Sequence, residues 1–439
     1  MTFKTATCAF FLLAAGTCIF AQTAHQAEAS QPAGEQMTAP APSAEESLPG
    51  QAVVSEIRID GLRKTRNSYL QALLKKYRGI TAGELDLRAV ETTLQAEGIF
   101  ESIQTELTDR GDGTAVLHIS VKEKLSFIPL PFAASSNGSA MGGLFIIDTN
   151  AFGVKDMFVV GGIFSKSTLM GMAQFAKPSL SLTQPGWAFG ASASKSSSTF
   201  TDLHDDEILT YDSMGFNVHA AITDRLTEHS HVSLGLAYRQ ISISDAQQKN
   251  GSETWAESYR ALSPSLSWSM STQDWNGCFL STKSLSASGS LSFYTDGTKA
   301  PAAAASLHIE QPFLSPRLRF IMQTSGAIWH KEHISQLGGG SAVGVAILPD
   351  DFHSPRLAGA SGGFEFAFAK ARWALFSLYA SYQAAFSEDS DGDGSFTHGV
   401  TGGTKMYLTK IAFPAFAFGV AYNVPLSLFK YSVAFGISL

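Results

Sequence analysis

Residues 389–394 (Asp-Ser-Asp-Gly-Asp-Gly) carry the pattern that most resembles a binding site, since acids at alternate positions begin a calcium-binding loop. Such a loop closes on a bidentate glutamate at its twelfth position. Val400 occupies that position here. We therefore interpret the segment as a solvated acidic loop, with a weak calcium site as the alternative.

The remaining residues that could do chemistry lack the necessary spacing. His330, His333 and His353 surround a long segment without the spacing of metal ligands. Gly338–Gly340 are not followed by a helix, so they do not form a phosphate-binding loop. Cys278 is the only cysteine outside the N-terminal leader, so neither an internal disulfide nor a cysteine metal site is expected. We predict no enzyme, no cofactor and no metal.

The N-terminus predicts export. Lys4 is followed by an uncharged, largely apolar stretch over residues 5–23, and the small residue Ala21 closes it. This pattern is typical of a secretory signal peptide, residues 1–21, cleaved near Ala21. Cys18 offers the alternative of a lipoprotein cysteine, although the residues before it are a poor match.

Two segments precede the main part of the chain. Residues 22–51 are rich in Ala, Gln, Glu, Ser and Pro and lack the apolar residues that build a core, so we expect a disordered linker. Residues 52–124 combine strand-like alternation with two stretches of apolar residues at helical spacing. Their order, β-α-α-β-β, predicts a small soluble α+β domain.

From residue 126 to residue 439 the helical period disappears and a period of two takes over. In residues 429–439, large apolar residues alternate with small or polar ones. A membrane β-barrel places such an apolar face against lipid and the small polar face toward a wet lumen. Residues 411–429 are long enough for a spanning helix. Their prolines and the period-two aromatics favour two strands instead.

The alternation predicts a 16-stranded antiparallel transmembrane β-barrel. An even number of strands puts both barrel ends on one side, which is the periplasm if the soluble domain lies there. Short turns are then expected on that side, and long outer loops at 198–212, 244–258 and 331–360. The predicted strands are 126–135, 139–148, 155–165, 168–180, 186–197, 213–223, 229–243, 259–271, 283–293, 303–312, 317–330, 361–370, 373–386, 397–408, 411–422 and 428–439.

The charge balance bears on partners. With 31 basic and 38 acidic residues the net charge is −7, and no basic run exists that could neutralise phosphates. We expect no nucleic-acid partner. The apolar strand face implies outer-membrane lipid as one partner.

Several segments of the sequence resemble a known family. Residues 57–61 (Ile-Arg-Ile-Asp-Gly), 98–100 (Gly-Ile-Phe) and 117–123 are similar to a POTRA domain. Residues 145–153 (Phe-Ile-Ile-Asp-Thr-Asn-Ala-Phe-Gly) and 271–284 resemble turns of the BamA/TamA/two-partner-secretion superfamily of outer-membrane assembly barrels. The resemblance covers residues 52–439. It implies unfolded or secreted client proteins bound at the POTRA edge, and possible periplasmic accessory proteins.

One departure concerns the long loop that this family folds into the barrel lumen. The family's loop carries an Arg-Gly tip, whereas this sequence has Gly344-Val345 there. Arg356 is a candidate replacement, and Glu365 matches the acidic wall position that supports the loop, so the two are a candidate pair. The alternative is that both are ordinary lumen or loop charges. The residues that carry the loop motif are Gly338, Gly339, Gly340, Val343, Gly344 and Arg356.

The first predicted barrel strand contains two prolines. Pro129 and Pro131 lie two residues apart, so one strand edge would lack two consecutive N–H donors. They are therefore candidates for a weak seam between the first and last strands. The alternative is that the strand begins after Pro131.

Three functions remain open. The first is assembly or translocation of client proteins through strand pairing at the POTRA edge and opening of the seam. The second is a passive pore or surface antigen that keeps the fold without this activity, which the missing loop arginine favours. The third is an adhesin that uses its outer loops.

Overall fold

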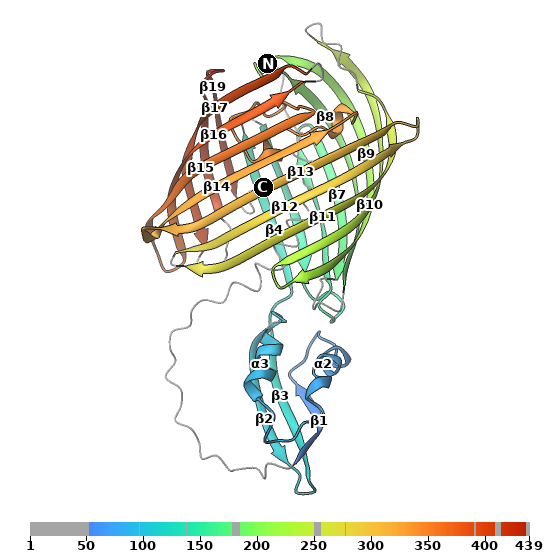
Figure 1. Cartoon of the computed structure of the whole chain (residues 1–439), viewed down its shortest axis with the longest axis vertical. Helices are drawn as coiled ribbons and strands as arrows, with labels where there is room; N and C mark the ends of the chain where they lie inside the picture. The colour runs from blue at the N-terminus through green and yellow to red at the C-terminus, as the bar shows by residue number, and fades with distance from the viewer. Residues whose placement is uncertain are drawn as a thin grey trace. The chain divides into compact units, whose positions relative to one another are not determined.

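The computed structural model describes residues 52–95, 97–136, 139–177, 185–249, 256–276, 278–389, 392–408 and 414–435. The predicted signal peptide and linker lie outside these residues, as do Leu439 and part of the acidic segment 389–394. The described residues form two compact units. Each unit is described by itself (Figure 1).

The smaller unit contains a three-stranded sheet and two helices in the predicted β-α-α-β-β order. The sheet order is β1-β3-β2, with β1 parallel and β2 antiparallel to the central strand β3. Among the described residues, no helix is long and apolar enough to cross a membrane. The elements are β1 (Val53–Asp60), α2 (Asn67–Leu73), the 3-10 helix η1 (Lys75–Tyr77), α3 (Leu87–Gln95), β2 (Phe100–Asp109) and β3 (Thr114–Glu123).

One face of this sheet is covered by the two helices. Leu70 of α2 and Val90 and Leu94 of α3 are fully buried, and they belong to one apolar cluster with Leu117 and Ile119 of β3. In the central strand β3, buried apolar residues alternate with polar ones. Burial of this single apolar face is what holds the small unit together.

The smaller unit also includes the segment Ile147–Phe158, which joins two barrel strands. The Asn150 amide nitrogen donates a hydrogen bond of 2.9 Å to the Thr65 hydroxyl, and both side chains are buried. The backbone N–H of Arg66 donates to the carbonyl of Gly153 at 2.8 Å. The Asp-Thr-Asn-Ala-Phe-Gly motif therefore packs on residues that follow β1 in the small unit.

Gly61 ends β1 in a conformation that only glycine adopts without strain. Its φ is +89°, and a Cβ atom there would lie 1.9 Å from the Val121 carbonyl oxygen of β3. Gly79 has a similar φ of +87°, but a Cβ atom there would meet nothing within 4 Å. A comparison of substitutions at Gly61 and Gly79 therefore distinguishes the cost of the left-handed backbone from the cost of the steric collision.

We expect Gly61→Ala to destabilise the small unit more than Gly79→Ala. The left-handed backbone costs alanine roughly 1–2 kcal/mol at either position, and Gly61→Ala must also displace the β3 backbone. Hydrogen exchange of the β3 amides in the full chain measures the difference. Equal protection in the two variants would contradict the close approach.

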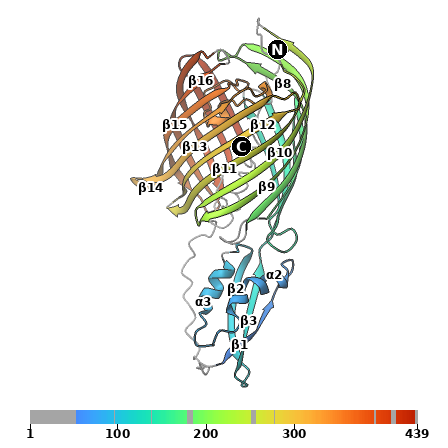
Figure 2. The same cartoon turned by 45° about the vertical axis from the view of Figure 1, so that its right-hand side comes forward.

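The larger unit is a closed barrel of sixteen antiparallel strands, as predicted (Figure 2). The strands are β4 (Phe127–Ser136), β5 (Ser139–Asp148), β6 (Met157–Ser165), β7 (Thr168–Lys177), β8 (Gly186–Thr201), β9 (Glu207–Thr227), β10 (Ser230–Gln248), β11 (Tyr259–Asn276), β12 (Phe279–Tyr294), β13 (Lys299–Phe313), β14 (Ser315–Trp329), β15 (Arg356–Lys370), β16 (Ala374–Glu388), β17 (Gly394–Leu408), β18 (Pro414–Asn423) and β19 (Leu428–Phe435).

Two of the three long loops were predicted wrongly. Much of 198–212 belongs to β8 and β9, and the first part of 244–258 extends β10 to Gln248. The extensions of β8 and β9 contain Phe200, Leu209 and Tyr211, which pack in one buried cluster, and the extension of β10 pairs with that of β9. The burial explains why the strands continue. The third predicted loop, 331–360, corresponds to residues 330–355 in the structure.

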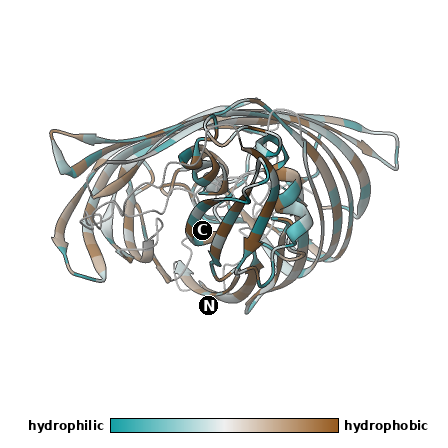
Figure 3. Cartoon of the chain, turned by 90° about the horizontal axis from the view of Figure 1, so that it is seen from below, coloured by the Kyte–Doolittle hydropathy of each residue, from teal (hydrophilic) through white to brown (hydrophobic). Residues whose placement is uncertain are grey.

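The barrel wall has two chemically different faces. In β15, Phe364, Phe366 and Phe368 are 44–48% exposed, whereas the intervening Glu365 and Ala367 are buried. Figure 3 shows apolar and polar residues alternating along the strands. Since an aromatic surface of this extent is unfavourable in water, the exposed face is the one that meets lipid, and its alternate positions face the lumen.

Candidate functional site

The segment between β14 and β15, residues 330–355, is here named the lumen loop. Its apolar side chains are buried and form one cluster with small or apolar residues of β15, β16 and β18. Those wall residues alternate with the exposed aromatic positions, so they face the lumen. The loop therefore packs inside the barrel. The loop residues in this cluster are Val343, Val345, Ile347, Leu348 and Phe352.

Backbone groups of the loop are held by polar side chains of the wall. The Gln383 side-chain oxygen accepts a hydrogen bond of 2.8 Å from the N–H of Ala346. The Asn423 amide nitrogen donates to the carbonyl of Ile347 at 3.1 Å, and Asn423 is fully buried. These bonds satisfy backbone groups that lie away from water, which fixes the loop against the wall.

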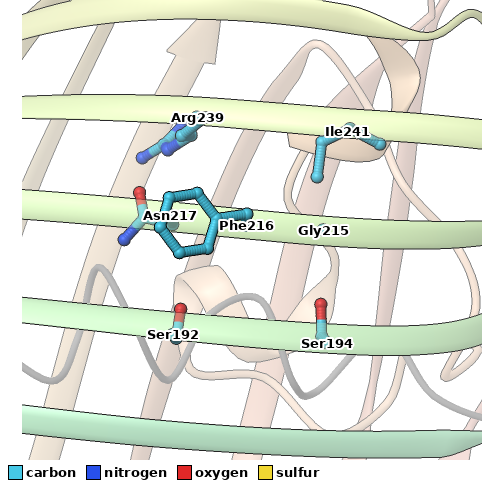
Figure 4. Close-up of a pocket in the computed structure, with 7 residues that line it drawn as sticks. All are labelled: Ser192, Ser194, Gly215, Phe216, Asn217, Arg239 and Ile241. Carbon is cyan, nitrogen blue, oxygen red and sulfur yellow. The ribbon is translucent and has the colours of Figure 1, made fainter.

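The start of the loop is attached to the opposite part of the wall. A pocket lies between β8, β9 and β10, and Figure 4 shows Asn217 between Arg239 and Ser192. The Arg239 guanidinium donates a hydrogen bond to the Gln336 side chain of the loop. The residues that line the pocket are Ser192, Ser194, Gly215, Phe216, Asn217, Arg239 and Ile241.

The predicted glycine motif permits close packing of the loop. A Cβ atom at Gly338 would lie 2.3 Å from the Trp329 ring. At Gly339 and Gly340, a Cβ atom would lie 2.6–2.7 Å from carbonyl oxygens of the loop itself. Gly344 has a φ of +69° and faces Gln323, and Val343 is buried.

His353 at the other end of the loop packs on the Phe200 ring, and burial lowers its pKa to about 4.

Glu365 lies at the centre of a buried polar cluster on the lumen side of the wall. Its nearest cation is Arg319, the residue directly opposite it on β14, at 2.8 Å. Ser377 and Tyr407 donate hydrogen bonds to its other oxygen at 2.5 and 2.8 Å. Lys405 lies 3.3 Å away. Every contact to this carboxylate therefore comes from neighbouring wall strands.

The candidate pair between Arg356 and Glu365 is not formed. Both residues lie in β15, nine positions apart, which is about 30 Å along an extended strand. Arg356 instead pairs with Glu388 of β16, and its side chain is half exposed. Arg319 is the cation that pairs with Glu365, and the sequence did not identify it. It lies inside the predicted strand 317–330, but only the strand register shows which residue is opposite.

We expect Arg319→Leu to cost the barrel about 3–5 kcal/mol, because it removes one partner of a buried ion pair. The matched change Arg356→Leu breaks a solvent-exposed pair and should cost less than about 1 kcal/mol. Urea unfolding of the barrel refolded into lipid vesicles measures both. Similar losses in the two variants would contradict the assignment of Glu365 to Arg319.

Both seam candidates lie inside the first barrel strand. β4 begins at Phe127, so the alternative that it starts after Pro131 is wrong. Between β4 and β19 the register joins Ala133–Ser136 to Ser432–Phe435, which is four residue pairs among the described residues. Pro129 and Pro131 lie beyond the last of the four described pairs.

One segment matches a catalytic sequence motif but does not have the backbone structure that the motif requires. Residues 359–363 read Gly-Ala-Ser-Gly-Gly, the spacing of a hydrolase nucleophile elbow. They lie within the continuous strand β15. The elbow requires a sharp strand-to-helix turn, so this serine is not placed as a nucleophile.

Neither family models nor curated proteins match the sequence. Solved structures do match the fold. BamA from Haemophilus ducreyi lacking POTRA domains 1–3 superposes with a TM-score of 0.65 at 13% identity, covering 88% of this chain and 84% of that one. The chain has the same fold as this barrel protein. CdiB from Escherichia coli matches with a TM-score of 0.61 at 12% identity over 100% of both chains.

A second CdiB gives the same result. The protein from Acinetobacter baumannii has a TM-score of 0.59 at 12% identity, covering 88% of this chain and 74% of that one. The matches span most of the chain, so they agree with the predicted fold of a small α+β domain followed by a 16-stranded barrel. At these identities, the matches show the fold alone.

Proposed function

We propose that this chain is an outer-membrane protein that inserts or exports client proteins, with its POTRA-like domain in the periplasm. The observation that carries the proposal is the seam. The first and last barrel strands close the wall, and the first of them contains two prolines, which cannot donate backbone hydrogen bonds. A client strand that pairs with an opened β4 or β19 satisfies backbone groups that lipid cannot.

The small domain offers a second place for strand pairing. The outer edge of β1 is partly occupied, because Val54 exchanges backbone hydrogen bonds with Gly79 and Ile80. Within the described residues, no backbone hydrogen bond joins the outer edge of β2 to another segment. We assign client binding to β2, where an extended segment adds as a fourth strand.

Locking the seam tests the proposal. In a Cys278→Ser background, Ala134→Cys with Ala434→Cys places a disulfide between directly opposed residues of β4 and β19. We expect assembly or export of client proteins to stop under oxidising conditions and to return on reduction. Depletion followed by outer-membrane proteomics identifies the client proteins to be measured.

The matched control uses the same residue of β19. Ala417→Cys with Ala434→Cys locks β19 to β18, which leaves the seam free. This control should retain activity whether oxidised or reduced. Full activity of the oxidised seam-locked barrel would count against opening of the seam.

The second candidate is a passive pore or surface antigen. The wall carboxylate Glu365 is neutralised by Arg319 of the wall, so the fold persists without the loop arginine on which the family relies. Planar-bilayer conductance separates the two functions. Assembly through the seam predicts small currents, because the lumen loop packs inside the barrel, whereas large steady currents without an assembly defect on deletion favour the pore.

A further inference from the structure

The tip of the lumen loop reaches both strands of the seam. Ser136 is the last residue of β4, and Lys430 lies near the start of β19, two residues before the Ser432 that pairs with Ser136. Asp350 of the loop lies between them. One of its carboxylate oxygens accepts a hydrogen bond of 3.1 Å from the Ser136 hydroxyl, and the other forms an ion pair with Lys430.

Lys430 is bound to the loop twice. Its ammonium group also donates a hydrogen bond of 2.7 Å to the carbonyl of Leu348. The Lys430 side chain is only 9% exposed, whereas that of Asp350 is 42% exposed. A buried ammonium that loses its partners is unfavourable, so Lys430 is stable in this position only while the loop tip is present.

The loop tip is itself firmly placed. Ile347 and Leu348 are buried in the apolar cluster on the lumen face, and Asn423 at the end of β18 binds the Ile347 carbonyl. Asp350 therefore projects from a segment that the wall holds on one side of the seam. Its bond to Ser136 is the contact by which this segment reaches β4 across the seam.

We propose that Asp350 is a latch that couples the lumen loop to the closure of the seam. While the loop tip is seated, one carboxylate ties β4 to β19 beside the paired residues of the two strands. Withdrawal of the tip breaks both side-chain contacts at once and leaves Lys430 without its acceptors, which favours separation of the strands. The latch rests on the proposed function, since it regulates the opening of that seam.

Hydrogen exchange tests the latch without reference to activity. The full chain is folded into lipid nanodiscs, and exchange is followed at the amides of Ala133–Ser136 and Ser432–Phe435. Loss of a charge-assisted contact should speed their exchange about tenfold in Asp350→Ala. Asp350→Asn keeps an acceptor for Ser136 but loses the ion pair, so it should give a smaller increase. Heat-modifiable gel mobility confirms that each barrel is folded.

The matched control is Glu388→Ala. It removes the ion pair to Arg356 beside the end of the same loop, on β15 and β16 rather than at the seam. Faster seam exchange in Asp350→Ala and not in Glu388→Ala supports the latch. Unchanged exchange in both Asp350 variants would overturn it. An equal increase in Glu388→Ala would also overturn it, because the loss of an ion pair away from the seam would then have the same effect.

The latch and the proposed function fail in different ways. If the seam disulfide stops client assembly while Asp350→Ala leaves seam exchange unchanged, the seam opens without a latch at Asp350. If seam exchange rises in Asp350→Ala but the disulfide does not affect assembly, the latch exists and the proposed function is wrong.

Discussion

Backbone hydrogen bonding in lipid is the constraint on which this structure depends. Hydrocarbon offers no partner to an N–H or C=O group, so a sheet that crosses a bilayer must close on itself. Sixteen strands do so here, and closure requires that β4 pair with β19, the strands farthest apart in sequence. β4 carries two prolines that cannot donate backbone hydrogen bonds. Closure therefore joins two strands that no turn connects, and one of them has fewer N–H donors to offer.

The wall also has to accommodate charge. A buried carboxylate is tolerated only when cations and hydrogen-bond donors surround it, and Glu365 finds them on the wall strands β14, β16 and β17. Because Arg319 already pairs with this carboxylate, the lumen loop is attached by other means: glycines that permit close packing, wall amides that bind backbone groups of the loop, and the contact of Asp350 with the seam. The loop is therefore held without an arginine at its tip.

The errors of sequence reasoning have identifiable causes. The segments around residues 200 and 245 are rich in polar residues, which favours loops. The first continues as a strand because Phe200 and Tyr211 become buried against each other, and the second pairs with this extended part of β9. Tertiary burial outweighed local composition there. The pairing of Arg356 with Glu365 was wrong because both residues lie in one strand, and a strand is too extended for positions nine apart to meet.

The sequence by itself determined the architecture: a β-α-α-β-β domain followed by sixteen strands with one apolar face. Those features depend on periodicity, since the alternation of side chains across a strand is a local property of the backbone. Only the tertiary structure decided which side chains meet. Arg319 opposes Glu365, and Asp350 reaches Ser136 and Lys430, through strand register and through a loop folded back into the lumen. Both depend on contacts between residues far apart in the chain, which no local pattern encodes.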